Sequence, residues 1–264
     1  MSSLAVALAQ LDIRFEDKAA NRIACEAAIV RAASSGADVV VFPEMTLTGF
    51  SMRARITGEK QSLSETVRFF CHLAKQYCVH VIFGVVFLEQ GKGKNMALVV
   101  DDSGTVIAQY QKMHLFSFAE EDKHFIAGEA PVFFKIKNIA CSLAVCYDLR
   151  FPGFFEAIAA HAPEVIFVIA NWPASRIEHW DALLKARALD CASIIVGANR
   201  VGIGGGQHYT GHSSMYDPSG NRLISMGRAT VRTCRIDCDM VKKYRARFPS
   251  LRDKRRPLYT RLLK

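Results

Sequence analysis

The chain of 264 residues has no uninterrupted apolar run of the length that a membrane-spanning helix requires. Such a helix needs about 18 or more consecutive apolar residues. The opening stretch MSSLAVALAQLDIRFED also lacks the basic segment of a secretory signal, and its short, partly alternating apolar part predicts a first β-strand instead. We therefore expect a soluble cytoplasmic protein without a membrane partner.

Cysteine pairs with metal-ligand spacing are missing as well. The eight cysteines are dispersed, and none belongs to a C-x-x-C motif. Cys234 and Cys238 lie four residues apart in a strand-like segment, but two thiols without a second ligand pair make a poor zinc site. The stretch GIGGGQ at 202–207 lacks the G-x-G-x-x-G spacing of a nucleotide-binding loop and predicts a flexible loop. We expect no bound metal.

An excess of basic residues is confined to the end of the chain. Ten of the 34 Lys and Arg residues, but only one of the 25 Asp and Glu residues, lie in 241–264, so residues 1–240 carry no net charge. Such a basic arm can bind nucleic acid, and a nucleic-acid-binding protein is kept as an alternative of a different class. However, no nucleic-acid motif is recognised, and apolar residues such as Phe248 and Leu251 are interspersed in the arm. We expect a domain over 1–240 and a C-terminal arm over 241–264 that packs on the domain or on a partner subunit.

Strand-like and helix-like segments alternate along the chain. Apolar runs such as ADVVVFPE, VHVIFGVVF and VIFVIANWP are typical of strands that are covered on both faces. Between them, NRIACEAAIVRAASSG, SLSETVRFFCHLAKQYC and HWDALLKARALDCA have the spacing of helices, the second capped by Ser62 or Ser64. The alternation predicts a single α/β domain built from layers of sheet and helix.

Three reactive side chains each follow an apolar strand-like run: Glu44 after DVVVFP, Lys112 after VIAQYQ and Cys146 after CSLAV. In α/β sheets the carboxyl ends of strands are where ligands bind, so the three could meet in one pocket. There a carboxylate can accept the thiol proton as sulfur attacks a substrate. An ammonium group, together with the backbone N–H of Tyr147, can stabilise the resulting oxyanion. Taken singly, each residue is more simply interpreted as a core thiol or a surface charge, and spacing alone favours that interpretation.

The motifs FPEMTLTGF (42–50), YQKMHLF (110–116) and CYDLRFP (146–152) resemble, in order and rough spacing, the signatures of the nitrilase, or carbon–nitrogen hydrolase, superfamily. The similarity continues through 170–190 and 197–202. The resemblance implies a four-layer αββα sandwich, a homodimer, and an enzyme without metal or organic cofactor. It also implies Glu44 as general base, Lys112 as oxyanion stabiliser and Cys146 as nucleophile.

The resemblance further implies a second active-site glutamate after the lysine motif. The segment HLFSFAEEDKHFIAG offers two adjacent candidates, Glu120 and Glu121. Glu121 is favoured because it lies seven residues before Gly128 of the following Ala-Gly pair, and Glu120 stays open as the alternative register.

The segments CYDLRFP and NWPASRIEHWDALLKARA resemble most the ω-amidases, which hydrolyse the terminal amide of 2-oxoglutaramate or 2-oxosuccinamate. Because these substrates carry a carboxylate, a cationic partner is expected. Arg176 is favoured for this role, since it follows a strand at the carboxyl end of the sheet, whereas Arg150 is read equally well as part of a structural pair. Aromatic and imidazole side chains are expected to line the pocket, namely Phe50, Trp172 and His179.

Two further interpretations stay open within and outside this family. The protein could instead hydrolyse an N-carbamoyl compound or a short aliphatic amide. It could also be a catalytically silent scaffold, although the presence of all three reactive residues disfavours that interpretation.

Overall fold

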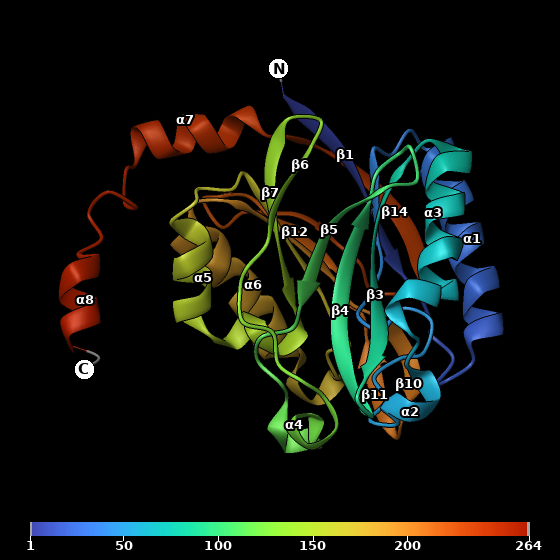
Figure 1. Cartoon of the computed structure of the whole chain (residues 1–264). Helices are drawn as coiled ribbons and strands as arrows, with labels where there is room; N and C mark the ends of the chain where they lie inside the picture. The colour runs from blue at the N-terminus through green and yellow to red at the C-terminus, as the bar shows by residue number, and fades with distance from the viewer. Residues whose placement is uncertain (1, 263–264) are drawn as a thin grey trace.

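The computed structural model describes residues 2–262 and contains two six-stranded sheets packed face to face (Figure 1). The first sheet has the order β14 (Thr230–Asp237), β1 (Ser3–Gln10), β2 (Val39–Val41), β3 (His80–Glu89), β4 (Lys92–Val100) and β5 (Val106–Gln111). The second sheet has the order β13 (Arg222–Ser225), β12 (Ser214–Tyr216), β9 (Ile194–Ala198), β8 (Val165–Ile169), β7 (Ile139–Val145) and β6 (Phe133–Ile136). Both sheets are mixed: β1, β2 and β3 run parallel in one, and β7, β8 and β9 in the other.

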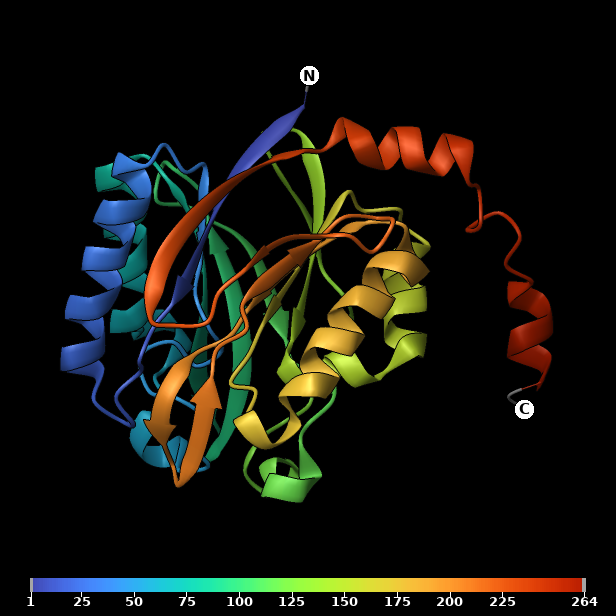
Figure 2. The ribbon, with the colours of Figure 1, turned by 180° about the vertical axis from the view of Figure 1, so that it is seen from behind.

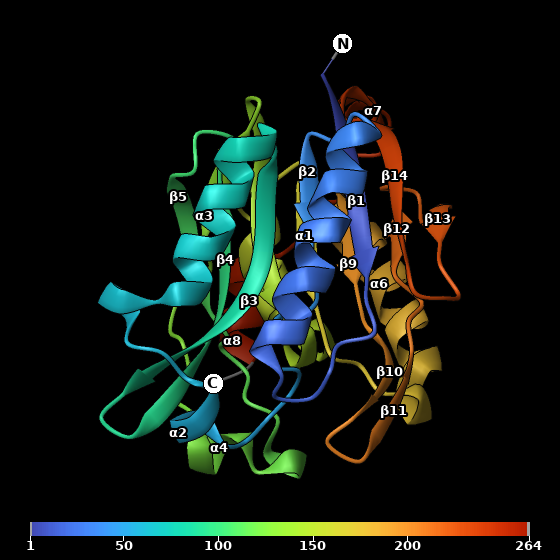
Figure 3. The ribbon, with the colours of Figure 1, turned by 90° about the vertical axis from the view of Figure 1, so that its right-hand side faces the viewer.

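Helices cover the outer face of each sheet. Helices α1 (Lys18–Ser34) and α3 (Glu65–Tyr77) lie on the first sheet, as Figure 3 shows from their side. Helices α5 (Pro152–Ala159) and α6 (Ile177–Cys191) lie on the second (Figure 1). This confirms the predicted αββα sandwich in a single domain. Of the two serines considered as the N-cap of α3, Ser64 is the one that caps the helix, because its hydroxyl accepts a hydrogen bond from the Val67 N–H at 3.1 Å.

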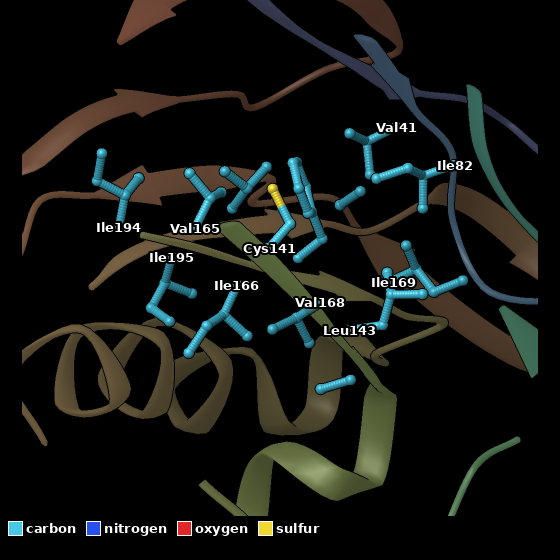
Figure 4. Close-up of a cluster of buried hydrophobic side chains, with 14 of the residues drawn as sticks. Val41, Ile82, Cys141, Leu143, Val165, Ile166, Val168, Ile169, Ile194 and Ile195 are labelled. Atoms are coloured by element: carbon cyan, nitrogen blue, oxygen red, sulfur yellow. The ribbon is translucent and has the colours of Figure 1, made fainter. Parts of the chain in front are cut away.

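The alternation of side chains along the strands explains the layers. On β1, Leu4, Val6 and Leu8 face the other sheet, while Ala7 and Ala9 face the helices. Figure 4 shows part of the main core, where Val165 and Ile194 lie on the face of the second sheet toward the first sheet, and Ile166 and Ile195 lie on the opposite face toward the helices. Each fully buried Val, Leu or Ile contributes about 1.5–3 kcal/mol of transfer free energy. This core holds the two sheets in a fixed position relative to each other. The carboxyl ends of the parallel strands of both sheets therefore lie at one edge of the sandwich.

Shorter elements surround the edge where the parallel strands end. They are α2 (Ala54–Thr57), α4 (Glu121–His124), the hairpin of β10 (Val201–Gly204) and β11 (Gln207–Thr210), and 3₁₀ turns at Gln61–Leu63, Ser117–Ala119, Cys146–Arg150 and Ala174–Arg176. The expectation of a flexible loop at 202–207 is therefore wrong for most of its residues, because backbone hydrogen bonds pair them in the hairpin. In the described part of the chain, no helix combines the length and the apolar character needed to cross a bilayer.

The basic arm forms helices α7 (Asp239–Arg247) and α8 (Arg256–Leu262), and the expected boundary at 240/241 falls inside α7. The Arg245 guanidinium donates to the carbonyl oxygens of Ala162 and Pro163 at 2.8 and 2.6 Å. Glu156 on α5 accepts from both Lys254 and Arg256. Figures 1 and 2 show α8 outside the four layers. The packing of the arm on a partner subunit, and the dimer itself, stay predictions.

Candidate active site

The three reactive residues named from the sequence converge at the edge where the parallel strands end. Glu44 follows β2, Lys112 follows β5 of the same sheet, and Cys146 follows β7 of the facing sheet. The Lys112 ammonium donates to Glu44 Oε1 at 2.9 Å. Cys146 is half-buried, whereas Glu44 and Lys112 are fully buried. Residues that are far apart in the sequence therefore share one site.

Glu44 is held in place by the close approach of its backbone to β3. A Cβ atom at Gly84 would lie 2.3 Å from the backbone nitrogen of Met45, so only glycine fits. The Thr46 N–H donates to the Gly84 carbonyl at 3.0 Å, and the Gly84 N–H donates to the Thr46 hydroxyl at 2.8 Å. These bonds fix the turn that carries Glu44 against the sheet.

Lys112 continues the pairing of β4 with β5 by one residue. Its N–H donates to the Asn95 carbonyl at 2.9 Å, and its own carbonyl accepts from the Gly128 N–H at 2.8 Å. A Cβ atom at Gly128 would lie 2.2 Å from the Gln111 carbonyl oxygen, which explains the glycine there. The lysine backbone is thus fixed on both sides, and its side chain points into the buried cluster.

Cys146 begins the 3₁₀ turn Cys146–Arg150 with a left-handed backbone, at φ 49°. A non-glycine residue in this conformation costs about 1–2 kcal/mol, a strain that is typical of functional sites. The turn is stabilised by Asp148, whose Oδ2 accepts from the Val145 N–H at 2.9 Å and from the Tyr110 hydroxyl at 2.7 Å. Its Oδ1 accepts from the His114 N–H at 3.0 Å. Asp148 therefore ties the cysteine motif to the lysine motif.

The second glutamate of the site is Glu121, and Glu120 lies elsewhere. Glu121 is fully buried and accepts from the Lys112 ammonium at 2.9 Å. Glu120 is exposed and pairs with Lys123 on the surface. The structure thus favours the register that the sequence interpretation preferred.

The two glutamates differ in how their oxygens are occupied. Glu121 accepts from Lys112 and Asn95 at Oε1 and from Lys112 and the Phe116 N–H at Oε2. Glu44 accepts from Lys112 and Asn95 at Oε1, but Oε2 has only the Asn171 N–H at 3.0 Å among the described residues. Glu44 alone therefore retains room for a further proton or donor.

The buried charges shape the ionisation of the site. Burial by itself lowers the pKa of Lys112, but Glu121, Glu44 and Cys146 outweigh it and raise that pKa well above its usual value. Burial raises the pKa of Cys146 well above its usual value, Glu44 adds to this rise, and Lys112 opposes it. At neutral pH the site therefore holds an ammonium group and a protonated thiol, and the thiol needs a base before it can attack.

A pocket of ≈ 280 Å³ opens at this edge, and Cys146 lies on its wall. The wall includes five other residues that the sequence named, Phe50, Tyr147, Arg150, Trp172 and Arg176. His179 is not among the lining residues, contrary to the expectation; it accepts a hydrogen bond from Arg150 at 3.1 Å and so lies behind that arginine. The buried cluster of Glu44, Lys112 and Glu121 lies behind the sulfur rather than on the wall.

Both candidate arginines line the pocket and are held by aromatic rings. The Arg176 guanidinium lies 5.4 Å from the centroid of Phe116 and 5.7 Å from that of Phe118. The Arg150 guanidinium lies 4.8 Å from the centroid of Trp172, so it belongs to the pocket rather than to an internal pair of the turn. Within residues 2–262, neither arginine forms an ion pair with a carboxylate. Their positive charges are therefore available to a bound anion.

Several residues of the site were not named from the sequence: Phe116 and Phe118 beside Arg176, and also Asn95, Asn171 and Tyr209. Asn95 bridges the two glutamates, Asn171 donates its N–H to Glu44 and lines the pocket, and Tyr209 on β11 also lines it. Asn171 carried a usable signal, because it directly follows a strand at the carboxyl end of the sheet. Tyr209 carried none, since its hairpin joins the pocket only through tertiary packing. In the part of the chain that the structure describes, no group of three or more His, Cys, Asp or Glu residues has a metal-binding arrangement.

Two facing sheets lie between layers of helices, and a thiol, a carboxylate and an ammonium group converge at one pocket. This arrangement is typical of hydrolases that use a nucleophilic side chain with an adjacent base. The family model for carbon–nitrogen hydrolases matches residues 5–246. The chain belongs to the carbon–nitrogen hydrolase family, as its three motifs indicated.

Individual relatives agree with this assignment. Omega-amidase YafV of Escherichia coli strain K12 is 38% identical over 225 residues, covering 83% of this chain and 85% of the relative. A protein of Staphylococcus aureus named "Hydrolase in agr operon" is 31% identical over 258 residues, covering 96% and 99%. A CN-hydrolase superfamily protein of Xanthomonas campestris, solved with an arsenic adduct in its active site, superposes with a TM-score of 0.90 at 30% identity, covering 96% and 98%. The family match and these relatives together show that the protein is an amide-hydrolysing enzyme.

Proposed function

We propose that the enzyme hydrolyses a small amide that also carries a carboxylate, of the 2-oxoglutaramate or 2-oxosuccinamate type, to the acid and ammonia. The observation that carries this proposal is the pair of pocket arginines, Arg150 and Arg176, without carboxylate partners among the described residues. A guanidinium group binds a planar carboxylate through two parallel hydrogen bonds. The name omega-amidase borne by the 38% identical relative supports the same substrate class.

The first half of the reaction forms a thioester. Glu44 Oε2 accepts the Cys146 proton while sulfur forms a bond to the amide carbon. The carbonyl oxygen becomes negative and is stabilised by the Lys112 ammonium and the backbone N–H of Tyr147. Tyr147 is the second residue of its 3₁₀ turn, where an N–H group has no partner within the turn. Glu44 then returns the proton to the nitrogen, the C–N bond breaks, and ammonia leaves.

The second half of the reaction releases the acid. Glu44 accepts a proton from water as the water oxygen attacks the thioester carbon, and the C–S bond then breaks. Glu44 returns that proton to the sulfur, which restores the thiol. Glu121, whose oxygens are fully occupied, keeps the Lys112 ammonium in position throughout. No step needs a group beyond these side chains, the substrate and water.

A panel of amides tests the proposed substrate class. Ammonia release is measured for 2-oxoglutaramate, 2-oxosuccinamate, an N-carbamoyl amino acid and a short aliphatic amide, with the wild type and with Arg176→Met. We expect kcat/KM to be highest for the two keto-acid amides and to fall about 10- to 100-fold in Arg176→Met, because a charge-assisted bidentate contact is lost.

The matched control is Arg68→Met on the exposed face of α3, which should leave every rate unchanged. The short aliphatic amide, which has no carboxylate, should be hydrolysed equally by the wild type and by Arg176→Met. Higher activity on the carbamoyl or aliphatic compound than on both keto-acid amides would reject the proposed class while leaving amide hydrolysis intact.

A further inference from the structure

Asn95 occupies a position on β4 that the fold would ordinarily give to an apolar side chain. Residues 95, 97 and 99 face the second sheet, and Ala97 and Val99 belong to the core between the sheets. Asn95 is fully buried, and its Oδ1 has no hydrogen-bond partner among the described residues. A buried acceptor without a partner costs about 1–3 kcal/mol. The presence of Asn95 is therefore not explained by packing.

The other end of the Asn95 amide makes two bonds to charged groups. Its Nδ2 donates to Glu44 Oε1 at 2.7 Å and to Glu121 Oε1 at 2.9 Å. Because both carboxylate oxygens can only accept, the atom between them must be the NH₂ group, and the orientation of the amide is fixed. Both of its protons are used, one for each carboxylate.

The cluster that Asn95 bridges holds two carboxylates but a single ammonium group. Two buried carboxylates that share a site cannot both stay ionised cheaply, and one tends to take up a proton. Lys112 compensates one negative charge, and Asn95 supplies neutral donors that stabilise the other. The backbone of Asn95 also accepts from the Lys112 N–H, so one residue positions all three charged groups.

We infer that Asn95 is a positioning residue that keeps both carboxylates ionised around Lys112 and so leaves Glu44 free to accept the proton of Cys146. The inference rests on the role of base proposed for Glu44. Without Asn95, Glu44 would keep two hydrogen bonds and Glu121 three, because Lys112 donates to both oxygens of Glu121. The proton would then go preferentially to Glu44, the carboxylate with fewer hydrogen bonds, and the base would be lost.

Three ionisable side chains adjoin the two carboxylates, and none of the three changes charge near neutral pH. Lys112 stays protonated, and the Cys146 thiol stays neutral because its pKa is raised by burial and by Glu44. Tyr209 faces the cluster from β11, and burial raises its pKa to about 12. A change in the pH dependence of the reaction on removal of Asn95 would therefore report the two carboxylates.

The test is the pH profile of kcat/KM for Asn95→Leu, measured with whichever amide of the panel is hydrolysed best. The kcat/KM profile reports the free enzyme, so its acid limb does not depend on the choice of amide. We expect activity at neutral pH to fall at least about tenfold, the acid limb to move to higher pH by a unit or more, and activity to recover at alkaline pH. An equal loss at every pH, with the limb unmoved, would overturn the inference.

Two further variants keep this result interpretable. Thr66→Val makes a comparable change at another buried donor, whose hydroxyl donates to the carboxylate of Glu59 outside the pocket that contains Cys146; it should leave the acid limb unmoved. Asn95→Asp keeps the shape of the side chain and adds a third carboxylate. The acid limb of its kcat/KM profile should therefore move further to alkaline pH than that of Asn95→Leu. This variant also provides the test if Asn95→Leu fails to fold. Full activity of Glu44→Gln would instead reject the proposed base, an outcome distinct from an unmoved limb in the Asn95 variants.

Discussion

Two clusters among the described residues are built around glutamate and lysine: the one at Glu44 and Lys112 is fully buried, and the one at Glu59 and Lys18 is half-buried. Glu59 accepts from the Lys18 ammonium and the Thr66 hydroxyl at Oε1, and from the Ser64 hydroxyl and the Thr66 N–H at Oε2. One negative charge meets one positive charge, and every bond distance lies between 2.5 and 3.0 Å. The cluster joins the start of α1 to the start of α3 and lies outside the pocket that contains Cys146.

The cluster behind Cys146 is unbalanced by comparison. It holds two carboxylates for one ammonium group, and one oxygen of Glu44 has a single donor among the described residues. Burial and the neighbouring Glu44 carboxylate both raise the pKa of the Cys146 thiol. A cluster whose charges balance and whose carboxylate oxygens are all fully hydrogen-bonded stabilises the fold. A cluster in which one carboxylate oxygen has a single donor can accept a proton and return it. Substitutions in the two clusters should therefore affect different properties, activity in the cluster behind Cys146 and stability in the cluster of Glu59.

The largest effect is expected from Cys146→Ala. No other group in the described pocket can form the acyl intermediate, so kcat should fall by about 1000-fold or more. Ammonia release from the best amide of the panel measures the loss. Cys71→Ala, a half-buried cysteine on α3, is the matched control and should retain full activity. Retention of even a tenth of the activity in Cys146→Ala would refute the assignment of the nucleophile.

Displacing Glu44 without removing it should be nearly as damaging. In Gly84→Ala the new methyl group would meet the Met45 nitrogen at 2.3 Å, so the turn that carries Glu44 must shift. A misplacement of about 1 Å costs on the order of 100-fold in rate, and kcat should fall by that amount. Gly153→Ala, where an added Cβ meets nothing within 4 Å, serves as the control and should be as active as the wild type. Equal activity of the two variants would show that β3 does not position the base.

A substitution in the balanced cluster of Glu59 should change the stability of the protein but not its activity. Burial alone would raise the pKa of Glu59, but its bonds from Lys18, Ser64 and Thr66 outweigh this and lower it to about 2. A carboxylate with a lowered pKa adds stability above its unfolded value of 4.5 and loses it as pH falls towards 2.

Glu59→Gln should therefore lower the free energy of unfolding by about 2 kcal/mol at pH 7, and this difference from the wild type should shrink as pH falls below 4.5. Denaturant titrations of both proteins at pH 7 and pH 3 measure it, and kcat at pH 7 should be unchanged. A difference that grows in acid would contradict the sign of this linkage.

The smallest effect is expected at the mouth of the pocket. Phe118 is 82% exposed and lies beside the Arg176 guanidinium, where an exposed cation–π contact contributes about 0.5–1 kcal/mol. Phe118→Ala should raise KM for a carboxylate-bearing amide about two- to fivefold with kcat unchanged. Phe133→Ala, another partly exposed ring, is the control because Phe133 lies on β6 outside the pocket. A fall in kcat alone would show that Phe118 acts on the chemical step rather than on binding.

Much of the fold and the charged centre of the site could be predicted from the sequence. Glu44 and Cys146 follow strands that are apolar on nearly every residue, Lys112 follows a strand with two glutamines, and the motifs of all three carry a family resemblance. Asn95 and Tyr209 could not be found in this way. A single polar residue in an apolar strand does not reveal what it bonds, and the hairpin of Tyr209 reaches the pocket through contacts between distant segments. His179 was misplaced because adjacency to pocket residues in sequence does not decide which side of a helix faces the cavity.

The central claim is that Cys146 becomes covalently acylated during turnover. The most direct measurement is a rapid acid quench of the enzyme mixed with excess amide, followed by mass spectrometry of the intact chain and of its peptides. We expect a transient mass increase equal to the acyl group, confined to the peptide that contains Cys146 and absent from Cys146→Ala. An active enzyme with no adduct, or with an adduct on a different residue, would contradict it.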